Sequence, residues 1–162
     1  MPIKLTWDDL LIEDPSLDDG RLLEDWEWLL SGQFRVVAGS KFGDWFVERP
    51  AGTVEMLDMV EGSLSEIASS RAEFQTLINT REKQELWLLS ELVLTLHEKG
   101  LVPGAGQCYA FEVPPCLGGK VDSENVEVMD LVVWVSICGQ LHRQTQALPP
   151  GTKISGFTVD NE

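Results

Sequence analysis

The sequence is poor in positive charge. Its 162 residues contain 12 lysines and arginines against 27 aspartates and glutamates, which gives a net charge of −15. A surface of this sign repels nucleic-acid phosphates and anionic lipid headgroups, and it attracts basic partners. No apolar run approaches the ~18 residues that a membrane-spanning helix needs, and the first residues lack the layout of a signal peptide. We therefore expect a cytoplasmic protein that binds neither nucleic acid nor membrane.

Cysteine and histidine are also scarce, with three and two residues, and the cysteines form no C-x-x-C pair. An unpaired odd number is typical of a reducing compartment and argues against a disulfide framework. Cys138 and His142 would share one face of a helix, and Cys108 and Cys116 could complete a zinc site, but the closely spaced ligand pairs of such sites are missing. We expect free thiols in the core, and neither a metal nor another cofactor.

The familiar catalytic motifs are missing as well. The chain has no G-x-S-x-G sequence, no P-loop and no dinucleotide-binding glycine pattern. Pairs of carboxylates occur throughout so acidic a chain, so their presence is not evidence of an acid–base catalytic site. We expect a protein that is not an enzyme.

The pattern of apolar residues, turns and caps predicts an α+β fold in a single domain spanning residues 1–162. A first helix is expected near residues 22–30, followed by a three-stranded antiparallel meander. Two central helices should follow, the first opening at a capping-box pattern at Ser63 and the second burying Leu86, Leu89, Val93 and Leu96. C-terminal strands and a short final helix complete the order. The expected ranges are 34–38, 42–48 and 53–57 for the meander, 63–78 and 82–99 for the helices, and 108–113 and 126–137 for the later strands, with 131–135 central in the sheet.

Negative charge is concentrated at the start of the chain, where residues 1–30 contain nine acids against Lys4 and Arg21. This segment is the best candidate to face a basic partner. Trp45 lies on the expected hairpin and could be an apolar anchor, because tryptophan is enriched at interface hot spots. Core packing is the competing interpretation of the tryptophans. The candidate partner-binding residues are Asp8, Asp9, Asp18, Asp19 and Trp45.

Several motifs of the second half are specific enough to compare with a known family. They are PGAGQCYAFEVPPCLGG at residues 103–119, EVMDL at 127–131, SICGQLHRQ at 136–144 and LPPGT at 148–152. They resemble a bacterial domain family of immunity proteins associated with type VI secretion DNase effectors, long catalogued as a domain of unknown function. The first half is similar through WEWLL at 26–30 and FGDWF at 42–46, and the order of elements is loosely similar to the SUKH superfamily. Some members carry an additional N-terminal domain, for which we expect no room here.

The resemblance implies a cytosolic immunity protein that binds and occludes a cognate toxin without catalysis. A DNase toxin presents a basic surface, which an acidic partner can occupy by imitating phosphate charge. The alternative is an intracellular module that binds a peptide or small ligand in a pocket near Gln107, Tyr109, Gln140 and His142. The sequence leaves the toxin's identity and the oligomeric state open.

Overall fold

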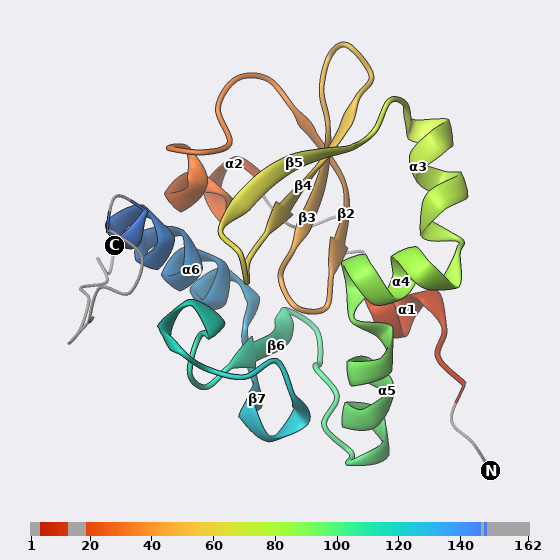
Figure 1. Cartoon of the computed structure of the whole chain (residues 1–162), viewed down its shortest axis with the longest axis vertical. Helices are drawn as coiled ribbons and strands as arrows, with labels where there is room; N and C mark the ends of the chain where they lie inside the picture. Colours follow the sequence, from red (N-terminus) through yellow and green to blue (C-terminus); the bar gives the residue numbers. More distant parts are fainter. Residues whose placement is uncertain (1–3, 13–18, 147, 149–162) are drawn as a thin grey trace.

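The centre of the molecule is a five-stranded antiparallel sheet in the order β1-β2-β3-β4-β5 (Figure 1). The computed structural model describes residues 4–12, 19–146 and 148. The expected meander is confirmed as β2, β3 and β4, and the structure adds one strand at each side of it. The strands are β1 Leu11–Ile12, β2 Arg35–Ser40, β3 Trp45–Glu48, β4 Val54–Asp58 and β5 Ser63–Ala68.

The fifth strand occupies residues that we expected to open a helix. Gly62 has a φ of +64° and turns the chain back after β4, so that Leu64 pairs with Leu57. Pairing with β4 thus outweighs the local capping-box pattern, because that pattern supplies only a cap and no buried helical stripe. The helix begins later, where the Ser70 hydroxyl accepts a hydrogen bond of 3.1 Å from the Glu73 backbone N–H.

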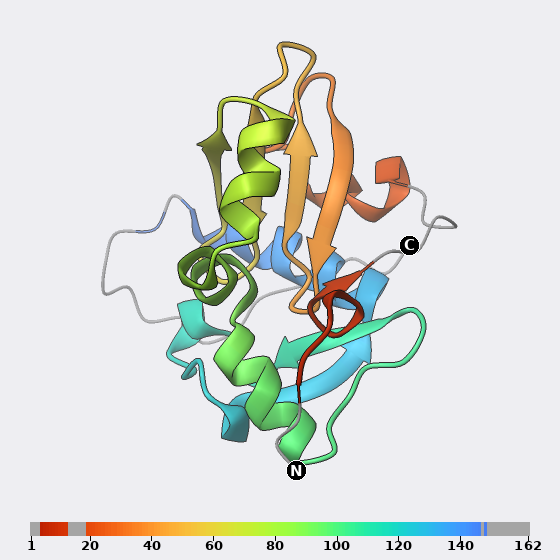
Figure 2. The same ribbon diagram turned by 90° about the vertical axis from the view of Figure 1, so that its right-hand side faces the viewer.

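Helices α3 (Arg71–Ile78) and α4 (Arg81–Leu88) cover one face of the sheet, and α5 (Ser90–Glu98) continues below them (Figure 2). Phe46 of β3 packs against Phe74 and Trp87, with ring centroids 5.2 and 6.1 Å apart. The single helix expected over 82–99 is broken at Leu89, which has a φ of +53°. The break rotates the apolar stripe, so the expected burial of Leu86 is wrong and that side chain is 62% exposed.

Short helical turns and the last helix cover the opposite face. They are α2 (Asp19–Leu22), η1 (Glu24–Trp26) and α6 (Leu131–Thr145), so the first helix expected at 22–30 is shorter and lies earlier. The indole N–H of Trp26 donates to the carbonyl of Val135 at 2.9 Å and joins η1 to α6. Trp134 of α6 donates likewise to the carbonyl of Phe42 at 3.2 Å.

The strand expected over 126–137 is only partly correct. Residues Val126–Asp130 form β7, but the chain then enters α6, where the Asp130 carboxylate accepts a hydrogen bond from the Val133 N–H at 3.0 Å. Burial in α6 follows a helical period, with Leu131, Trp134 and Val135 buried and the two valines between them exposed. Residues 131–135 are therefore not a central strand buried on both faces.

The remaining elements form a small second sheet and its connections. β6 (Gln107–Phe111) pairs antiparallel with β7, and it agrees with the strand expected at 108–113. The turns η2 (Pro115–Leu117) and η3 (Ser123–Asn125) connect them, and α1 (Trp7–Leu10) packs beside α5. The α+β class is confirmed. Within the described residues, no helix is long and apolar enough to span a membrane.

Candidate functional site

The structure gives the expected acidic residues different roles. Asp8 of α1 is exposed, whereas the Asp9 carboxylate accepts hydrogen bonds from the backbone N–H and the hydroxyl of Thr6, at 2.8 and 3.1 Å. The Thr6 backbone N–H contributes most to lowering the pKa of Asp9, and its carboxylate lies 3.8 Å from Nε2 of His97. Asp9 therefore holds α1 together and against α5. Asp18 and the side chain of Asp19 lie outside the described residues.

Trp45 is part of the core. Its side chain is 2% exposed, and a Cβ at the cross-strand neighbour Gly39 would lie 2.5 Å from its six-membered ring. The glycine leaves the space that the indole fills. The position of Trp45 supports core packing. The interpretation of Trp45 as an exposed interface anchor on the hairpin is therefore wrong.

The four residues of the alternative ligand pocket do not surround one cavity. The Tyr109 hydroxyl donates to the Leu101 carbonyl at 2.8 Å, and the Gln140 amide donates to the Ser136 hydroxyl at 3.1 Å. Gln107 lines a hollow of 320 Å³ beside Lys41 and Leu131. His142 lines a separate hollow at the far end of α6.

That second hollow is the larger, at 660 Å³, and we call it the β5 groove. Its walls are the turn between β4 and β5, the segment after η1, η2 and the end of α6. Nε2 of His142 lies 2.8 Å from the carbonyl oxygen of Met59, which the ring N–H can donate to. The residues that line the groove are Trp28, Leu29, Val60, Glu61, Gly62, Ser63, Leu64, Pro115, Cys116, His142, Thr145 and Gln146.

The walls of the groove are fixed by close contacts. A Cβ at Gly62 would lie 2.3 Å from Nδ1 of His142, so only glycine allows the turn to approach the ring. Trp28 donates its indole N–H to the carbonyl of Gly139 at 3.2 Å and stacks on Trp26 with ring centroids 5.8 Å apart. The groove is thus a preformed feature of the fold.

Acidic side chains accompany the groove along the edge of the sheet. Residues 50–70 contain four acids, Glu55, Asp58, Glu61 and Glu66, and no lysine or arginine. Arg49 pairs with Glu55, and the Asp58 carboxylate accepts hydrogen bonds from the N–H groups of the turn that follows it. Glu61 and Glu66 are exposed, and neither carboxylate has a partner among the side chains that the structure describes. Two uncompensated negative charges therefore lie along this edge, Glu61 in the turn before β5 and Glu66 within the strand.

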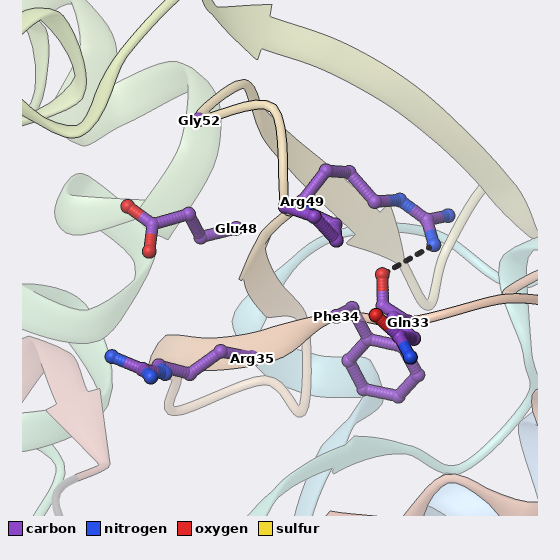
Figure 3. A pocket seen from close by; sticks show the side chains of 7 residues that line it. Gln33, Phe34, Arg35, Glu48, Arg49 and Gly52 are labelled. Atoms are coloured by element: carbon purple, nitrogen blue, oxygen red, sulfur yellow. Dashed lines mark hydrogen bonds between the residues drawn. The ribbon is translucent and has the colours of Figure 1, made fainter.

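A third hollow, of 420 Å³, lies where β2 begins and β3 ends (Figure 3). One of its two arginines, Arg49, is engaged within the fold, because it donates to the carbonyls of Ser31 and Gln33 at 2.6 and 3.3 Å. Figure 3 shows Arg35 and Glu48 projecting together to the side opposite Arg49, where Glu48 pairs with Arg71 at 3.1 Å. Two of the charged side chains that line this hollow, Glu48 and Arg49, therefore have structural partners within the fold.

Asp44 and the thiols of Cys108 and Cys138 are buried, whereas Cys116 is exposed, so the expectation of thiols in the core is wrong for Cys116. Burial raises the pKa of Asp44 to about 7 and that of the Cys108 thiol to about 12. It likewise raises the pKa values of Cys116 and Cys138, which keeps all three thiols protonated at neutral pH. Within residues 4–12, 19–146 and 148, no three side chains of His, Cys, Asp or Glu gather as metal ligands would.

Part of the chain matches a known protein family. Residues 68–142, from the end of β5 to near the end of α6, match the family described as T6SS immunity protein Tdi1, C-terminal. The resemblance to type VI secretion immunity proteins is confirmed. The match gives no support to the looser SUKH likeness.

The other comparisons are weaker. The crystal structure of Atu4351 from Agrobacterium tumefaciens is similar with a TM-score of 0.48 and 15% sequence identity, over 75% of this chain. The chain covers 62% of that protein, less than two thirds of its length. No curated protein matches the chain.

Proposed function

We propose that this protein is a cytoplasmic immunity protein that binds a cognate toxin and occludes it without catalysis. The observation that carries the proposal is the match of residues 68–142 to the Tdi1 immunity domain. The matched residues include α3 to α5, β6, β7 and most of α6. An inhibitor of this kind acts stoichiometrically, so it needs a complementary surface and no reactive group.

The charge of the chain supports a basic partner. A net charge of −15 creates a field that accelerates encounter with a cationic surface, and nucleases carry such a surface because they bind phosphates. Asp8 is exposed and belongs to the most acidic part of the chain, so we assign it, with Asp18 and Asp19, to this encounter. Asp9 contributes to the same field, although its carboxylate is engaged by Thr6.

The decisive experiment uses the product of the gene adjacent to that of this protein. Expression of that product alone is expected to arrest growth, and co-expression of this protein should restore it. The two purified proteins should elute together as a 1:1 complex from a size-exclusion column. A harmless neighbour, or a toxic neighbour that this protein neither binds nor neutralises, would refute the proposal.

A further inference from the structure

The outer edge of β5 is open to another strand. β5 is the last strand of the sheet, and among the residues that the structure describes no further strand pairs with it. Figure 2 shows it at the margin of the sheet, with α3 lying over the sheet face. At the opposite margin, β1 is only two residues long. A terminal strand leaves a row of backbone N–H and C=O groups without partners, which is a template for strand addition.

The first four residues of β5 form a regular template. Ser63, Leu64, Ser65 and Glu66 pair without interruption with residues of β4, and the register shifts only beyond Glu66. Edge strands are usually protected by proline, lysine or a central bulge. None of these occurs within residues 63–66, where the only charged side chain is Glu66. This single carboxylate disfavours an acidic neighbouring strand and favours a basic one.

A basic neighbouring strand would relieve charge repulsion between acidic side chains at this edge. Glu66 lies directly opposite Glu55 in the β4–β5 pair, and like charges in that position repel. Arg49 compensates Glu55, but Glu66 has no compensating charge among the described residues. A lysine or arginine on an added strand would supply it.

The β5 groove extends the same edge at its other end. Glu61, Ser63 and Leu64 contribute to the groove, and Trp28 and Leu29 form part of its apolar wall. A lysine or arginine side chain can lay its aliphatic stem along such a wall while its charged end stays at the rim. Glu61 provides an exposed carboxylate at the turn where that charged end would lie.

We propose that an extended, basic segment of the cognate toxin adds to the outer edge of β5 as a sixth strand and places one cationic side chain in the β5 groove. This inference rests on the proposed function and specifies how the toxin is held. A second copy of this chain is a poor occupant, because each copy carries −15 and would bring its own Glu66 to the shared edge. The backbone of the added strand supplies affinity, and the two glutamates select for positive charge.

The test compares charge reversals on and off this edge. The double variant Glu61→Lys with Glu66→Lys should weaken binding of the catalytically inactivated neighbouring gene product at least about tenfold. The variant Glu61→Gln with Glu66→Gln should weaken it by a smaller factor. The control Glu98→Lys with Glu112→Lys changes the net charge equally at exposed sites on α5 and after β6, and should change Kd less than about threefold. Thermal melting of each variant checks that the fold is intact.

Hydrogen exchange tests the strand addition itself. Amides of residues 63–68 should exchange more slowly in the complex than in the free wild-type protein, because outward-facing N–H groups gain acceptors. If wild type forms the complex but neither the edge variants nor this exchange respond, the sixth-strand inference is wrong and the immunity function stands. If wild type forms no complex, both fail. If the free protein is a dimer whose residues 63–68 are already protected, the edge belongs to a second copy and the inference is overturned.

Discussion

Asp44 is a carboxyl side chain enclosed between two turns of the sheet. Its Oδ1 accepts a hydrogen bond from the Met59 N–H at 2.7 Å, and its Oδ2 lies 2.8 Å from the Ser40 hydroxyl, which can donate to it. Burial and, to a smaller extent, the nearby Asp58 carboxylate raise its pKa to about 7, against the lowering effect of these two hydrogen bonds. Asp44 thus connects the β2–β3 turn to the end of β4. Its raised pKa means that the side chain is still partly protonated near pH 7.

This environment predicts a specific pH dependence of stability. The pKa in the unfolded chain is about 3.9, so between about pH 4 and pH 7 the folded protein holds a proton that the unfolded chain has released. The contribution of Asp44 is therefore fully present below pH 4 and is lost as the pH rises through 7, by at most about 1.4 kcal/mol per pH unit. Asp44→Asn keeps an acceptor for Met59 and does not titrate. Urea melts should show wild type losing stability relative to this variant from pH 4 to 7, with no further change above pH 7.5. A constant difference across that range would show that Asp44 is ionised in the folded protein.

At the scale of elements, the break between α4 and α5 changes which leucines form the core. Leu88 is fully buried, whereas Leu86 of the same helix is 62% exposed. Leu88→Ala should lower the free energy of unfolding by about 2–5 kcal/mol, because it removes buried methyl groups and leaves a cavity. Leu86→Ala should change it by less than about 0.5 kcal/mol. Denaturant melts of the pair check this, and a larger loss for Leu86→Ala than for Leu88→Ala would mean that the apolar stripe includes Leu86, as it would in an unbroken helix.

Some elements of the fold could be predicted from the sequence alone, and others could not. The α+β class, the meander and β6 follow from turns and period-2 alternation, which are local signals. Residues 132–135 are β-branched or aromatic and favour a strand, and only the cap at Asp130 and the burial of every third or fourth residue reveal α6. β5 depends on pairing with β4, which a capping-box pattern at Ser63 conceals.

The candidate site was predictable to a similar degree. The absence of lysine and arginine from residues 50–70 is visible in the sequence. It indicates an acidic sheet edge only once β5 is known to be the terminal strand. His142 could be named from the sequence, whereas its position beside Gly62 comes from the contact of α6 with the β4–β5 turn. Trp45 was open to two interpretations because a hairpin tryptophan packs inward or outward according to its register, and Gly39 opposite it decides for the core.

At the scale of the whole molecule, the proposed binding assigns separate effects to two kinds of negative charge. The carboxylates of the β5 edge act at short range once the partner is seated, and they should govern dissociation. The acids near the start of the chain act through the long-range field, which is screened beyond about 8 Å at physiological ionic strength. They should govern the rate of encounter.

This separation predicts distinct kinetics for the N-terminal acids. The triple variant Asp8→Asn, Asp18→Asn and Asp19→Asn should slow association with the neighbouring gene product several-fold at low salt and change dissociation by less than about twofold, because rim charges act chiefly through encounter. Asp9 is left in place because its carboxylate holds Thr6 and lies 3.8 Å from His97, so its replacement would also disturb α1. Surface-binding kinetics at about 50 and 500 mM salt provide the measurement, and at the higher concentration screening should bring the association rates of wild type and variant together. Association that responds to neither the salt nor the three substitutions would mean that the acidic field plays no part in recognition.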